Sequence, residues 1–79
     1  MGDGARLSTA FAHVIRRHRS RKGLSQEALA EAAEIHHTYV GLLERGKRKP
    51  TIDVAHRLPV ALGVKLSTLI NEAEREVRE

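Results

Sequence analysis

Hydrophobic residues recur along the chain every three or four positions, which is the spacing that places them on one face of an α-helix. Ser8 has the side chain of a helix N-cap, and Gly23 is the residue type that commonly follows a helix end. A first helix is therefore predicted between them, after a loose tail over residues 1–7. The inward positions of this segment are Leu7, Phe11, Val14, Ile15 and His18.

Two short helices separated by a tight turn are predicted next. The first begins after Ser25, another expected N-cap, and the chain then turns near Glu34 and Ile35. The second runs from about His37 to Arg45 and stops at Gly46. The predicted inward positions of the two helices are Leu29, Ala30, Ala33, Val40 and Leu43.

A fourth helix begins after Thr51, its expected N-cap, and ends at Gly63. Its predicted apolar face consists of Ile52, Val54, Ala55, Leu58 and Leu62. Because a proline inside a helix costs ~3 kcal/mol, we expect a kink or early fraying at Pro59.

The last helix spans about Leu66 to Arg78, and one stripe of it is apolar. This stripe consists of Leu66, Leu69, Ile70, Ala73 and Val77. Strand-like alternation is absent from the sequence. The predicted fold class is therefore all-α, with five helices in a single domain over residues 1–79.

The charge of the chain is biased and unevenly placed. Lys and Arg number 14 against 10 Asp and Glu, and cations gather in residues 6–22 and 45–49. Two basic clusters favour a polyanionic partner, although cations that only keep the protein soluble are the alternative. The chain has no cysteine, which excludes disulfides and permits a cytoplasmic location. No apolar run approaches the roughly 20 residues of a membrane span, so no membrane partner is expected.

The segment QEALAEAAEIHHTYVGLLER, residues 26–45, has the spacing of a helix-turn-helix, whose second helix enters the major groove of DNA. The motifs GLSQEALA, ERGKRKPT and ALGV also occur in order. With them, residues 15–70 resemble the lambda-repressor and Cro-type (Xre-like) helix-turn-helix family. The resemblance implies a five-helix domain that binds double-stranded operator DNA, usually as a two-fold dimer.

The resemblance also implies roles for individual residues. A glutamine would contact phosphate, the start and outer side of the second helix would face the groove, and the cations beyond it would grip the backbone. The implied DNA-binding residues are Gln26, His36, His37, Thr38, Gly41, Leu42, Arg45, Lys47, Arg48 and Lys49. Arg19 and Glu44 match a structural ion pair of the family.

The chain departs from the family pattern at several positions. Glu34 occupies the usual glycine of the turn, and His36 replaces a better N-cap. Gly41 and Leu42 replace polar reading residues, so specificity would rest on thymine methyl groups or DNA shape. Lys65 stands where a capping residue usually precedes the last helix.

The five histidines have more than one interpretation. His36 and His37 are expected to contact bases or phosphate, with plain surface residues or metal ligands as less favoured alternatives. If they contact DNA, their protonation in mild acid would strengthen binding. His13, His18 and His56 are interpreted as structural or surface residues. No metal site, cofactor or catalytic constellation is expected, so the protein is not predicted to be an enzyme.

Ile70, Ala73 and Val77 lie beyond the part of the last stripe expected to cover the bundle. They are predicted to form a homodimer contact, with packing inside the chain as the alternative. The predicted function is a sequence-specific transcriptional regulator that binds a near-palindromic operator, such as a phage-type repressor or a restriction–modification controller. It would associate with the nucleoid when bound to DNA. The alternative is an antitoxin-type protein that binds a toxin partner and regulates its own operon.

Overall fold

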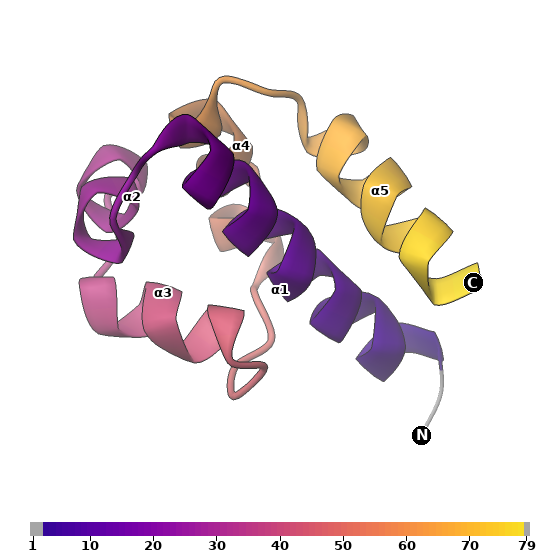
Figure 1. Ribbon diagram of the computed structural model, residues 1–79. Helices are drawn as coiled ribbons and strands as arrows, with labels where there is room; N and C mark the ends of the chain where they lie inside the picture. The colour runs from indigo at the N-terminus through magenta and orange to yellow at the C-terminus, as the bar shows by residue number, and fades with distance from the viewer. Residues whose placement is uncertain (1–2, 79) are drawn as a thin grey trace.

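The computed structural model describes residues 3–78, with side chains described from Arg6 to Arg78. This part of the chain contains five helices and no strand, which confirms the predicted all-α class. The helices are α1 (Asp3–Lys22), α2 (Gln26–Ala33), α3 (His37–Glu44), α4 (Ile52–Leu62) and α5 (Leu66–Arg78). The long α1 crosses the molecule between α5 on one side and the α2–α3 pair on the other (Figure 1).

An aliphatic core holds the five helices together, since the chain has one Phe, one Tyr and no Trp. Each helix contributes at least one residue without exposed surface: Val14, Leu29, Val40, Leu58 and Leu69. The inward positions predicted for α2 and α3 are all buried. The two short helices of the helix-turn-helix are therefore fixed on a scaffold formed by the other three.

The first helix is longer than predicted. It begins at Asp3, so Ser8 lies inside α1 and does not cap it. Ala5, Arg6 and Leu7 are good helix formers, and Leu7 gains contact with the core when the helix extends. The predicted tail is therefore wrong from residue 3 onward, and residues 1–2 lie outside the described part of the chain.

The predictions of an inward Ile52 and of early fraying at Pro59 are both wrong for α4. Ile52 is 78% exposed, because it occupies the first position of the helix, at the edge of the buried stripe. The helix also continues past Pro59 to Leu62 without early fraying. Pro59 is buried, and its carbonyl accepts a 3.0 Å hydrogen bond from the N–H of Val64, which helps to close the helix end.

The apolar stripe of α5 is divided between the core and the surface. Ala73 has no exposed surface, so the expectation that it lies uncovered is wrong. It is packed into the common core and leaves no surface for direct contact with a second copy. Ile70 and Val77 are half-buried and pack at the edge of the core, which leaves part of each side chain accessible.

Candidate nucleic-acid interface

The turn between α2 and α3 has the geometry of a helix-turn-helix. Ser25 caps α2 as predicted, because its hydroxyl accepts a 2.9 Å hydrogen bond from the N–H of Ala28. Glu34 ends the helix in the left-handed region, with φ 59° and ψ 43°. The next N–H, of Ile35, donates to the carbonyl of Ala30 at 2.9 Å. Glu34 therefore adopts the conformation for which glycine is usually used.

The turn is also supported from α4. Nη1 of Arg57 donates a 3.1 Å hydrogen bond to the carbonyl of Glu34. This bond satisfies a carbonyl at the helix end that the left-handed turn leaves without a helical partner. The turn that leads into α3 is therefore held from α2 and from α4.

The start of α3 presents two histidines to solvent. His36 is the N-cap, and its Nδ1 accepts a 3.2 Å hydrogen bond from the N–H of Thr38. The rings of His36 and His37 are stacked, with centroids 4.7 Å apart. Because Nδ1 of His36 accepts, the proton of the neutral ring lies on Nε2, which remains free to donate to a base or phosphate. His36, His37 and Thr38 are all exposed, as a surface that contacts DNA requires.

The middle of α3 is arranged differently from the sequence interpretation. Gly41 is buried, and a Cβ built on it would lie 3.3 Å from Nη1 of Arg45 and 3.4 Å from Oε1 of Gln26. The absence of a side chain lets Arg45 and Gln26 lie across the helix. Gly41 thus makes room for two polar side chains, and Leu42 beside it is half-buried.

A network of charged and polar side chains joins α1, α2 and α3. Arg19 donates to both carboxylate oxygens of Glu44, through Nε at 2.6 Å and Nη2 at 2.9 Å. Arg19 also donates to the carbonyl of Leu24 at 2.8 Å, and Gln26 donates to Oε1 of Glu44 at 3.0 Å. The hydrogen bond with Glu44 raises the pKa of Arg19 although burial lowers it, so the guanidinium stays charged. Gln26 is thereby held at the start of α2, where phosphate contact is predicted.

The segment after α3 is an exposed cationic loop. Gly46 has φ 72°, and the N–H of Lys47 donates to the carbonyl of Leu42 at 2.8 Å. Arg45, Lys47, Arg48 and Lys49 are exposed. Among the described residues, none of these four forms an ion pair, so their charge is available to an external anion.

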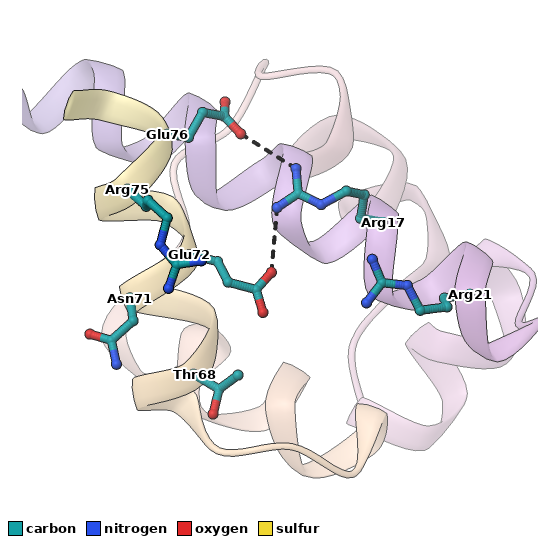
Figure 2. A pocket seen from close by; sticks show the side chains of 7 residues that line it. All are labelled: Arg17, Arg21, Thr68, Asn71, Glu72, Arg75 and Glu76. Carbon is teal, nitrogen blue, oxygen red and sulfur yellow. Dashed lines mark hydrogen bonds and ion pairs between the residues drawn. The ribbon is translucent and has the colours of Figure 1, made fainter. Parts of the chain in front are cut away.

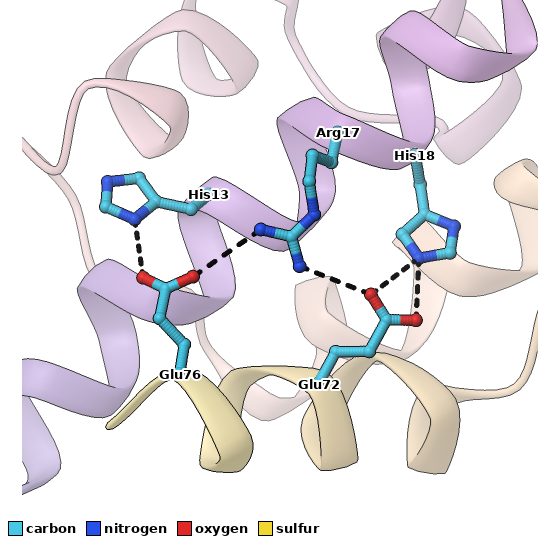
Figure 3. A network of polar contacts seen from close by, with 5 residues as sticks. All are labelled: His13, Arg17, His18, Glu72 and Glu76. Carbon is cyan, nitrogen blue, oxygen red and sulfur yellow. Dashed lines mark hydrogen bonds and ion pairs between the residues drawn. The ribbon is translucent and has the colours of Figure 1, made fainter. Parts of the chain in front are cut away.

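The basic residues of α1 are placed differently, because Arg17 and two histidines face acids of α5 (Figure 3). Arg17 lies 3.4 Å from Glu72 and 3.5 Å from Glu76. His18 lies 3.1 Å from Glu72, and His13 lies 2.7 Å from Glu76. Burial raises the pKa of Glu72, but hydrogen bonds and charges from His18 and Arg17 outweigh this and lower it overall.

The sequence pattern does not predict this seam between α1 and α5, because the first basic cluster is expected to face a polyanion. The available signal was the spacing of Arg17 from His13 and of Glu76 from Glu72, which in each pair is one helical turn. A polar cleft of about 540 Å³ opens beside it, as Figure 2 shows. Its lining carries both signs of charge: Arg17, Arg21, Thr68, Asn71, Glu72, Arg75 and Glu76.

Two other kinds of site were sought over the described residues. No three His, Asp or Glu side chains there gather closely enough to hold a metal ion. None of the helices in residues 3–78 is long and apolar enough to cross a membrane. The exposed start of α3 and the cationic loop after it form the candidate interface.

The fold is that of a helix-turn-helix domain, and known proteins share it. Residues 15–69 match the helix-turn-helix family. An uncharacterised helix-turn-helix transcriptional regulator of Methanothermobacter thermautotrophicus is 42% identical over 50 residues, which cover 63% of this chain and 72% of that protein. The control protein C.SmaI of Serratia marcescens is 37% identical over 64 residues, which cover 81% of this chain and 76% of that protein.

Solved structures agree with this assignment. The restriction–modification controller protein C.AhdI from Aeromonas hydrophila has a TM-score of 0.76 at 35% identity, over 78% of this chain and 94% of that protein. The chain belongs to the lambda-repressor-like helix-turn-helix family. It is a DNA-binding transcriptional regulator.

Proposed function

We propose that the protein binds a near-palindromic operator as a homodimer and regulates the adjacent promoter. Each subunit would place α3 in a major groove, with the two half-sites ~34 Å apart. The observation that carries this proposal is the continuity between the exposed start of α3 and four unpaired cations at its other end. Such a surface can contact bases and flanking phosphates at the same time.

The residues of this surface would make different kinds of contact with DNA. His36, His37 and Thr38 would reach base edges or phosphates from the start of α3, where N-terminal residues of a recognition helix approach the bases. Leu42 would contact thymine methyl groups, as apolar side chains do in the major groove.

The polar residues around them would position the helix. Gln26 would donate to phosphate from the start of α2, and Gly41 would give Arg45 room to turn toward the backbone. The loop residues Lys47, Arg48 and Lys49 would neutralise phosphates and supply most of the salt-dependent affinity.

Among regulators of this family, we infer that the chain acts as a controller of a restriction–modification system. Support comes from its similarity to control proteins such as C.SmaI and to the controller C.AhdI. A controller needs no catalytic residue, since it acts by occupying DNA. A restriction endonuclease or methyltransferase gene beside its own would support this specific role, and their absence would favour another regulator of the same family.

The test is selection of bound duplexes from a random DNA library at near-physiological salt, followed by sequencing. We expect enrichment of a two-fold symmetric motif. The variant His37→Ala with Thr38→Ala should alter the enriched bases, whereas Lys47→Ala should lower recovery of all sequences alike. If the folded protein enriches no motif, the proposed operator binding is wrong.

A further inference from the structure

The largest exposed apolar side chains of the described residues are both on α4, at its two ends. Ile52 at the first position is 78% exposed, and Val60 in the last turn is 69% exposed. Single exposed apolar residues are common on protein surfaces. What distinguishes Ile52 is its surroundings.

Ile52 stands on the rim of a small groove of about 160 Å³ between α1, α4 and α5. The groove is lined by Leu7, Ser8, Phe11, Pro50, Thr51, Ile52, Ala55 and Ile70. A cavity of about 150 Å³ can admit a benzene molecule, so this groove is large enough for a branched aliphatic side chain. A projecting side chain and a hollow of matching chemistry therefore lie next to each other on one face.

The absence of charged side chains from the lining of this groove is compatible with a second copy as the partner. None of the eight lining residues is charged, although the chain carries a net charge of +4. Two copies with the same net charge repel each other, and an uncharged patch is where they can approach at least electrostatic cost. A two-fold interface also requires one patch to be complementary to itself, which adjacent knob and groove provide.

We propose that two copies of this chain associate by reciprocal insertion of Ile52 into the partner's groove against Ile70. The inference rests on the proposed homodimer, and it moves the centre of the contact from the stripe of α5 to the start of α4. Ala73, buried in the core, takes no part. Ile70 contributes because it lines the groove, and Val77 lies outside that lining.

The position of Ile52 links this contact to DNA binding. Only Pro50 and Thr51 separate it from the cationic loop that ends at Lys49. Packing Ile52 against a second copy would restrain this loop. The loop would then lose less conformational entropy when it binds phosphates. The two α3 helices of a pair would also be joined near their DNA-facing side, as simultaneous insertion in two grooves requires.

The test is sedimentation equilibrium of the full chain without DNA, for wild type, Ile52→Asp and Val60→Asp. Val60 is the matched control, because it is equally apolar, exposed and on the same helix. We expect Ile52→Asp to raise the dimer dissociation constant at least tenfold and Val60→Asp to leave it unchanged. Asp at the start of α4 is favoured by the helix dipole, so loss of association would not reflect loss of folding. Circular dichroism checks this directly.

Three results would overturn the inference. The wild type could be monomeric at all accessible concentrations, which would leave this face to a different protein, such as a toxin. Ile52→Asp could associate like wild type, or Val60→Asp could disrupt association to the same extent. Because no DNA is present, these results are independent of the library selection. A dimer that enriches no motif would keep the inference and remove the proposed operator.

Discussion

Arg19 of α1 and Glu44 of α3 form a bidentate ion pair that connects the first helix to the end of α3. The Glu44 side chain is only 2% exposed, and that of Arg19 only 13%. A buried pair is weak evidence of net stability, because both charges lose their hydration. Removal of one partner is destabilising, because the remaining charge stays buried without a counter-ion.

We therefore expect Arg19→Met to lower the free energy of unfolding by about 3–5 kcal/mol. Urea unfolding followed by circular dichroism measures this change. The control is Arg16→Met, three residues earlier on the exposed side of α1, where a change within about 0.5 kcal/mol is expected. Equal losses in both variants would mean that the ion pair does not anchor α3.

Glu34 gives a second prediction, because its left-handed backbone is strained for a residue with a side chain. That conformation costs an L-residue roughly 1–2 kcal/mol, and glycine adopts it freely but loses more entropy on folding. Glu34→Gly should therefore stabilise the protein by about 1 kcal/mol. Thermal unfolding of the variant beside wild type measures the effect.

The control for this prediction is Glu31→Gly, an exposed position inside α2 that loses the same charge. Glycine within a helix should destabilise by about 1 kcal/mol, so the two variants should shift in opposite directions. A loss of stability in both would mean that the Glu34 side chain contributes more than its backbone costs.

The sequence predicted the parts of the fold that depend on helical periodicity. The caps Ser25 and Thr51 and the stripe of α3 were all placed correctly, because local chemistry decides them. Predictions failed where packing against another helix determines the start of a helix or the burial of a residue. The start of α1 depends on contact between Leu7 and the core, and Ala73 is covered by helices distant in sequence.

In the candidate site too, features set by local sequence were predictable and features set by packing in space were not. The exposed cationic loop after α3 could be read from its composition. The role of Gly41 could not, because it depends on how Arg45 and Gln26 cross α3 in space. The exposure of Ile52 also escaped prediction, since periodicity gives the direction of a residue but not the extent of the helices that cover it.

Glu72 gives a third prediction, which concerns pH. Its pKa is lowered below the ordinary value of 4.5 by His18 and Arg17, which outweigh the effect of burial. A carboxylate with a lowered pKa contributes stability above its unfolded value, and the contribution is lost as pH falls through the folded value. Glu72→Gln should therefore be less stable than wild type at neutral pH, and the difference should disappear in acid.

Unfolding measured from about pH 7 to about pH 3 would follow this convergence. Glu74→Gln is the control, because Glu74 is exposed on the same helix and its side chain forms no hydrogen bond or ion pair within the described residues. The unfolding free energy of Glu74→Gln should change with pH in the same way as that of wild type. A difference for Glu72→Gln that stays constant with pH would show that the ion pairs across the α1–α5 seam contribute nothing.

His36 gives a fourth prediction, which concerns the N-cap of α3. Its Nδ1 accepts a 3.2 Å hydrogen bond from the N–H of Thr38. Losing an N-cap side chain costs typically about 1 kcal/mol. His36→Ala should therefore lower the free energy of unfolding by about 1 kcal/mol, whereas His36→Asn, which keeps a capping acceptor, should not.

Urea unfolding of both variants beside wild type measures this change. His37→Ala serves as the control, since His37 follows the cap and does not provide it. If His37→Ala loses as much stability as His36→Ala, the effect arises from the stacked rings and not from the cap.

The cationic loop gives the last prediction. Lys47 is exposed and lies directly after the turn that ends α3, so we expect it to neutralise one phosphate. Binding releases about one counter-ion per neutralised phosphate, so Lys47→Ala should reduce the slope of log affinity against log salt by roughly one. Fluorescence anisotropy with a selected duplex at several salt concentrations gives this slope.

Lys65→Ala removes the same charge from the segment between α4 and α5 and should leave the slope unchanged. An unaltered slope for Lys47→Ala would remove this lysine from the interface, whereas equal decreases would mean that total charge, and not the loop, controls binding.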